Sequence, residues 1–147
     1  MRRAKKLTFL LTSLILSIMC FCQIASAAES PARASLYLSS YGAYLSAESS
    51  SYTGTLNIEF DVVAAQRSDY VGVSELIIYK SNGSRVAAIT GSTRNGLLRA
   101  NALAHAYTYL YNGTPGTSYY AVVTVYAEKD GGSDSRTITT NTCVAPG

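Results

Sequence analysis

Few residues in this chain could carry out chemistry. His105 is the only histidine among 147 residues, so general base catalysis, a catalytic triad or a histidine metal site would have to be built on it. It opens an alternating stretch and has neither a Gly-x-Ser-x-Gly motif nor a metal-spaced partner near it. A locally hydrogen-bonded or solvated histidine is the favoured interpretation. We therefore expect no catalytic residue and no cofactor.

Two groups of carboxylates deserve the same test. Glu59 and Asp61 are two residues apart, so in a strand they share one face. Paired carboxylates can hydrolyse glycosides, but this spacing is also that of any solvated strand face. Asp130 and Asp134 lie in a glycine-containing loop with Ser133, and oxygen ligands in such a loop can hold calcium. The spacing does not fit an EF-hand, so calcium is the alternative and turn residues are the main interpretation.

Tyrosine is the abundant functional side chain, with twelve copies. Aromatic faces stack on sugar rings and anchor protein contacts. Strand alternation prevents all of these rings from being buried, so some should form an exposed patch. Cross-strand tyrosine pairing, which stabilises sheets without a ligand, is the competing interpretation. The candidate binding residues are Tyr107, Tyr109, Tyr120 and Tyr126, and further tyrosines near the start of the domain are Tyr37, Tyr41 and Tyr44.

The N-terminus has the pattern of a secretory signal peptide. Four basic residues within the first six are followed by an apolar run and by the small residues 25–27. We expect cleavage between Ala27 and Ala28, and a secreted, extracellular protein with no membrane contact afterwards. An uncleaved anchor is the alternative, but the apolar run is short for a spanning helix. A lipoprotein is disfavoured because bulky residues precede Cys20 and Cys22.

Removing this segment changes the charge and the cysteine count. Of twelve Lys and Arg against nine Asp and Glu, four basic residues leave, so eight remain against nine and the net charge is −1. No basic cluster remains, which argues against nucleic-acid binding. Cys143 becomes the sole cysteine, so neither an internal disulfide nor a thiolate metal cluster can form. A Cys143-linked dimer is one alternative and a free thiol the other.

The remaining sequence predicts strands separated by turns. In residues 113–140, Pro115-Gly116 marks a turn, and two apolar faces then alternate through a predicted central strand. Residues 55–63 show apolar–polar alternation, and Asn82-Gly83 joins residues 73–80 to 85–90 as a hairpin. We expect loops at residues 64–72 and 91–104, the second with a short helix as an alternative, and another strand at residues 105–111.

The sequence Pro-Gly-Thr-x-Tyr, followed by alternating valines, resembles the entry to strand F of fibronectin type III and other immunoglobulin-like sandwiches. The resemblance implies that Tyr119 is the tyrosine whose hydroxyl bonds back across the corner before that strand. The absence of tryptophan departs from the family pattern, so another side chain must fill that part of the core. The chain also resembles small secreted proteins of Gram-positive bacteria that share a domain of unknown function.

These observations predict an all-β protein: an antiparallel, immunoglobulin-like or fibronectin III-like β-sandwich of about seven strands, with a small barrel as the second choice. The expected organisation is a signal helix at residues 1–27, a leader at 28–34, one domain at 35–142 and a tail at 143–147. The leading functional hypothesis is a non-catalytic module that binds an extracellular protein or glycan. A structural, self-associating protein and a carboxylate-dependent hydrolase are the alternatives.

Overall fold

The computed structural model describes residues 35–47 and 53–147. The predicted signal peptide, its cleavage site at Ala27 and Ala28, and the leader at residues 28–34 lie outside the described residues. The compact unit that contains the described residues is Ala34–Gly147. None of its described segments is a helix long and apolar enough to cross a membrane.

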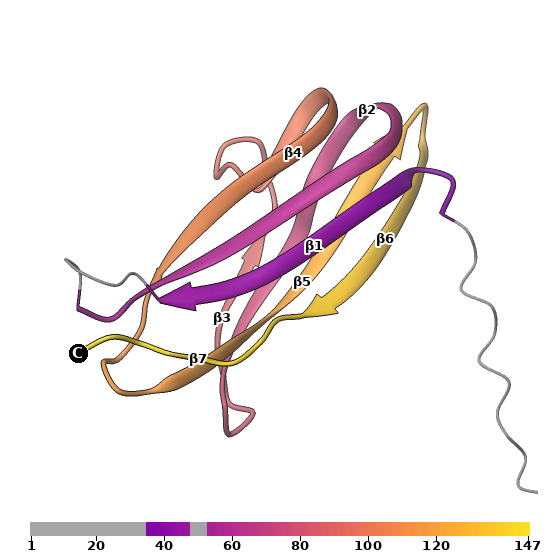
Figure 1. Cartoon of the computed structure of the whole chain (residues 1–147). Coiled ribbons are helices and arrows are strands. Elements are labelled where there is room, and N and C mark those ends of the chain that lie inside the picture. The colour runs from indigo at the N-terminus through magenta and orange to yellow at the C-terminus, as the bar shows by residue number, and fades with distance from the viewer. Residues whose placement is uncertain (1–34, 48–52) are drawn as a thin grey trace, which may run out of the picture. The chain divides into compact units, whose positions relative to one another are not determined.

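The described chain is all-β and contains no helix, and every strand pairing in it is antiparallel. The all-β prediction is therefore confirmed (Figure 1). The strands are β1 (Leu38–Ala47), β2 (Thr55–Lys80), β3 (Arg85–Thr90), β4 (Leu98–Asn112), β5 (Ser118–Lys129), β6 (Gly132–Thr139) and β7 (Cys143–Val144).

The long strand β2 organises the sheet, because its two halves have different neighbours. The first half lies between β1 and β4, with Ile58 opposite both Leu45 and Tyr109. The second half pairs with β5 on one side, while β3 and the start of β4 share the other side. Figure 1 shows β2 turning back near its midpoint. The apolar faces of the two halves can therefore contribute to one core.

That core is built from the alternating positions that the sequence predicts. Leu56, Ile58 and Val62 of β2 are fully buried, as are Val123 and Val125 of β5. Burying a Val, Leu or Ile side chain stabilises a fold by roughly 1.5–3 kcal/mol. β5 is hydrogen-bonded to β2 on one side and to β6 on the other, so the predicted central strand is confirmed.

The turns follow from residues that accept a left-handed backbone. Asp130 and Gly131 both have positive φ, at 51° and 80°, and close the two-residue turn between β5 and β6. At the predicted Asn82-Gly83 hairpin, Gly83 has positive φ (85°) and Asn82 does not. Instead, the side chain of Asn82 accepts a hydrogen bond from the N–H of Ser84 at 3.0 Å. A bulge at Ile78 and Tyr79 accommodates the resulting loop.

Three sequence predictions about segments are wrong. Residues 64–72 are not a loop, because β2 continues through them; backbone groups there remain paired, as when the N–H of Ala65 donates to Tyr37 O. Residues 98–104 are neither loop nor helix, because β4 begins at Leu98 and pairs with β2 from there. The chain is also paired beyond residue 142, since Cys143 lies opposite Tyr119 in β5.

Candidate ligand-binding groove

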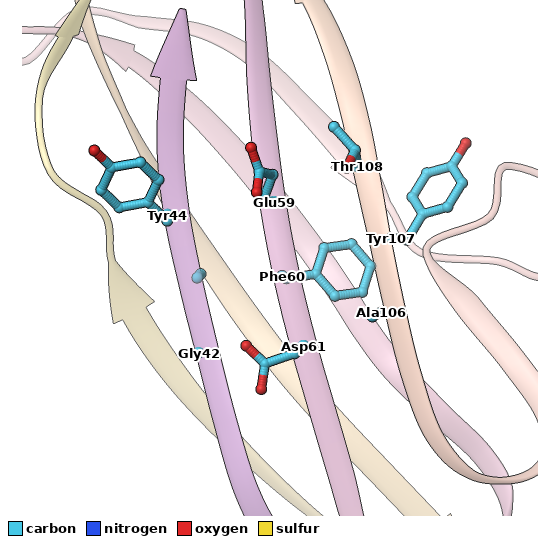
Figure 2. Close-up of a pocket in the computed structure, with 9 residues that line it drawn as sticks. Gly42, Tyr44, Glu59, Phe60, Asp61, Ala106, Tyr107 and Thr108 are labelled. Atoms are coloured by element: carbon cyan, nitrogen blue, oxygen red, sulfur yellow. The ribbon is translucent and has the colours of Figure 1, made fainter.

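An open groove of about 750 Å³ crosses the first half of the sheet over β1, β2 and β4. A volume of this size lies within the range of small-ligand sites. Figure 2 shows the side chains that line it. They are Gly42, Ala43, Tyr44, Glu59, Phe60, Asp61, Ala106, Tyr107 and Thr108.

Strand register places the polar members of the groove in neighbouring rows. Tyr44, Glu59 and Thr108 lie side by side across the three strands. Because side chains alternate along a strand, this row and the next polar row project from the outer face, whereas Phe60 is buried beneath them. Tyr44 is the most exposed tyrosine in the described part of the chain, at 57%. The groove therefore combines an accessible aromatic ring with two carboxylates on one face.

The next row holds Asp61 between two small residues, Gly42 and Ala106. A Cβ atom placed on Gly42 would lie only 2.8 Å from Oδ1 of Asp61, so the carboxylate occupies the space that a larger residue would need. Figure 2 shows the Asp61 side chain turned towards β1. Among the described residues no hydrogen bond or ion pair engages Asp61, while Glu59 accepts a hydrogen bond from the hydroxyl of Ser46 at 3.0 Å.

The structure does not bring the four predicted binding tyrosines together. Tyr107 lines the groove and is 40% exposed. Tyr109 packs against the core. Tyr120 stacks on Tyr79, with ring centroids 5.2 Å apart. Tyr126 donates its hydroxyl proton to Glu128 at 2.7 Å, and burial raises its pKa, with that carboxylate adding to the effect. Such tyrosine contacts stabilise the sheet, as the competing interpretation expected of some rings.

Sequence reasoning did not single out Tyr44 as a binding residue. The signal was present in the alternation of β1, where Gly42, Tyr44 and Ser46 share a face with small and polar character. Only the register with β2 shows that this face adjoins Glu59.

His105 lies beside the groove but is not one of its lining residues. It is 9% exposed and packs edge-on against Phe60, with centroids 5.6 Å apart. Its Nε2 lies 2.7 Å from the carbonyl oxygen of Gly96. Because a carbonyl only accepts, Nε2 carries the proton and donates it. The ring therefore ties the segment before β4 to the sheet.

Asp130 of the β5–β6 turn and Asp134 of β6 are both engaged by the protein itself. Asp134 accepts hydrogen bonds from the hydroxyl of Ser35 at 2.6 Å and from the N–H groups of Leu36 and Tyr37 at 2.7 and 3.1 Å. The Ser35 hydroxyl first, and then these N–H groups, lower the pKa of Asp134. Asp130 instead pairs with Lys129 at 3.2 Å. Different partners thus occupy the two carboxylates proposed as calcium ligands.

Asp69 of β2 binds the turn between β5 and β6 through Asp130 and Lys129. Its Oδ2 accepts the N–H of Asp130 at 2.9 Å, and its Oδ1 lies 3.3 Å from Nζ of Lys129. The backbone bond, followed by the lysine, lowers the pKa of Asp69. The ammonium of Lys129 has a raised pKa because Asp130, and then Asp69, favour its charged form. These contacts are structural and lie outside the groove.

Tyr119 is fixed at the start of β5. It is 1% exposed, and its hydroxyl accepts the N–H of Thr114 at 2.9 Å, five residues upstream. Burial would raise its pKa, but the hydrogen bonds from Thr114 outweigh that effect and the pKa is lowered. The ring packs edge-on against Tyr111 and covers Gly113, where a Cβ atom would lie 2.7 Å from it.

Cys143 is a free, partly buried thiol in β7.

Comparisons of the chain with protein-family models, curated proteins and solved structures find no match. The groove and its side chains therefore carry the functional argument.

Proposed function

We propose that this protein is a secreted, non-catalytic binding module that receives a glycan in the groove across β1, β2 and β4. The observation that carries the proposal is the row formed by Tyr44 and Glu59, with the carboxylate of Asp61 beside it, which no described residue engages. An aromatic ring offers a stacking surface for a sugar. Carboxylates accept the strong, charge-assisted hydrogen bonds that pairs of sugar hydroxyls can donate.

The arrangement favours binding over glycoside hydrolysis. A hydrolytic pair must flank the scissile bond, with one group acting on the leaving oxygen and the other on the sugar carbon or a water molecule. Glu59 and Asp61 project in the same direction from one strand, so both approach a ligand from the sheet. The groove lining contributed by β1 and β4 contains no carboxylate.

The export and fold parts of the proposal rest on sequence and local geometry. We propose an immunoglobulin-like or fibronectin III-like sandwich in which the two halves of β2 belong to opposite sheets. The hydrogen bond from Thr114 to Tyr119 supports this proposal, because the tyrosine corner of those folds bonds to the backbone a few residues upstream. The basic and apolar N-terminus supports secretion with cleavage between Ala27 and Ala28.

The test is a glycan array followed by calorimetric titration of each glycan that binds. Tyr44→Ala should weaken binding about tenfold, because loss of one stacking contact costs on the order of 1.4 kcal/mol. Asp61→Asn should weaken it about tenfold or more, because hydrogen bonds to a charged group are worth roughly 1.5–3 kcal/mol. Both side chains are exposed, so thermal stability should change little.

Tyr70→Ala is the matched control, because Tyr70 is 43% exposed and does not line the groove. It should bind like the unmodified chain. Equal losses for Tyr44→Ala and Tyr70→Ala would refute the groove as the site. If the folded protein binds only peptides, its partner is a protein and not a glycan. If it cleaves a bound glycan, it is an enzyme.

A further inference from the structure

One edge of strand β4 has no partner among the described residues. Within the described part of the chain it pairs only with β2, and no backbone hydrogen bond reaches residues 104–112 from any other described segment. Figure 1 shows β4 at the margin of the sheet. A free edge presents N–H and C=O groups that can pair with another strand.

The register identifies which backbone groups are free. The N–H of Gly113 donates to Gly54 O at 2.8 Å, so this pair is hydrogen-bonded. Bonded and non-bonded pairs alternate in an antiparallel ladder. The residues at even-numbered positions from 104 to 112 therefore point their N–H and C=O groups away from β2. The bond pattern of Leu45, whose outward groups contact Asn141, agrees with the same alternation on the other side of β2. The free groups belong to Ala104, Ala106, Thr108, Leu110 and Asn112.

The other sheet edges carry protection that β4 lacks. On β1, the amide of Asn141 accepts from Leu45 N at 3.0 Å and donates to Leu45 O at 2.8 Å, which occupies that edge. β6 is eight residues long and carries Asp134 and Arg136, and β3 is six residues long. Short strands and charged side chains discourage edge pairing. β4 has no Lys, Arg, Asp or Glu from Ala100 to Asn112.

The side chains of this edge are also unusually apolar for exposed positions. Leu110 is 62% exposed, and Tyr107 adds a ring that is 40% exposed on the same strand. Exposed apolar side chains beside an open edge are typical of a surface that another chain covers. The edge is uncharged, so a second copy would bring no like charges together.

We propose that two copies of this chain dimerise by antiparallel pairing of their β4 edges about a twofold axis. Centring the axis on Thr108 uses all of the free groups from Ala104 to Asn112. It sets Leu110 of one copy opposite the small Ala106 of the other, and Thr108 opposite Thr108. On the inner face, Tyr107 of one copy then lies opposite Tyr109 of the other, and such aromatic cross-strand pairs stabilise antiparallel strands. A strand that pairs with itself in this way satisfies the twofold symmetry of a closed dimer.

Amide hydrogen exchange at several protein concentrations tests the proposal directly. The protein without its predicted signal peptide, residues 28–147, is used with a reducing agent present, so that Cys143 cannot link two chains. The amides of Ala106, Thr108 and Leu110 should exchange rapidly in dilute solution and become protected as the dimer forms. The amides of Tyr107 and Tyr109 bond to β2, and should be protected at every concentration.

A charged variant and its control complete the test by analytical ultracentrifugation. Thr108→Lys sets two lysines opposite each other at the axis, and should weaken dimerisation about tenfold or more. Within one chain the new lysine adjoins Glu59, so the fold should tolerate it. Leu103→Lys adds the same charge to β4 outside the paired segment, and should leave dimerisation unchanged. A chain that stays monomeric at high concentration, or a dimer whose protected amides lie outside residues 104–112, would overturn the proposal.

Discussion

Replacing Tyr119 with phenylalanine should destabilise the fold without disturbing its packing. The substitution removes only the hydroxyl that accepts the N–H of Thr114 at 2.9 Å. The ring that covers Gly113 and packs edge-on against Tyr111 remains. The experiment therefore isolates the hydrogen bonding of this hydroxyl at the start of β5.

The size of the effect follows from the burial of that bond. A net hydrogen bond between neutral groups contributes about 1 kcal/mol, and leaving a buried donor without a partner costs roughly a further 1–3 kcal/mol. Tyr119 is 1% exposed, but Thr114 is exposed and the bond between them is part-buried, so water can replace part of the lost interaction. We therefore expect the free energy of unfolding to fall by about 1–2 kcal/mol, at the lower end of this range.

Urea unfolding followed by circular dichroism measures this loss, with an expected midpoint shift of roughly 1 M. Tyr120→Phe is the control. The ring of Tyr120 is partly exposed and stacks face-on against Tyr79, and the substitution keeps this contact. The control should change stability by less than about 0.5 kcal/mol. If Tyr119→Phe is equally silent, the corner hydrogen bond does not stabilise this fold and the immunoglobulin-like proposal loses its structural support.

Two further predictions concern pH. Asp134 has a lowered pKa in the fold, so its stabilising effect is complete above its ordinary value of 3.8 and is lost as the pH falls through the lowered value. Asp134→Asn should flatten that acid loss in urea titrations and speed amide exchange at Leu36 and Tyr37; an unchanged acid profile would contradict this role. Burial raises the pKa of Tyr111 above 10.0, so stability should fall as the pH rises past that value, and Tyr111→Phe should remove part of this alkaline loss.

Strands with strong local patterns were predictable, and strands defined by context were not. In β5, buried Val123 and Val125 alternate with partly exposed neighbours, and β-branched residues favour strands on their own. Residues 64–72 contain Arg67 and Asp69, whose polarity indicates a loop. In the structure these residues belong to β2. Arg67 donates to Asn101 O at 2.7 Å, and Asp69 accepts the N–H of Asp130 in the β5–β6 turn. Such long-range contacts leave no local signal.

The candidate groove was only partly predictable for the same reason. Alternation alone places Glu59 and Asp61 on a solvated face, and the structure agrees. That Tyr44 and Thr108 flank Glu59 depends on the registers of two separate strand pairs. A shift of one residue in either pair would send those side chains to the opposite face. A single sequence does not determine such a register.

The groove and the free edge belong to the same three strands, so the two proposals are physically coupled. Pairing through β4 would continue the groove floor from Ala106 and Thr108 of one copy into those of the other. A glycan long enough to contact both copies binds the dimer better than the monomer, and by mass action must strengthen dimerisation. A glycan confined to the Tyr44 side contacts one copy and leaves dimerisation unchanged. The response of dimerisation to ligand length therefore locates the ligand along the sheet.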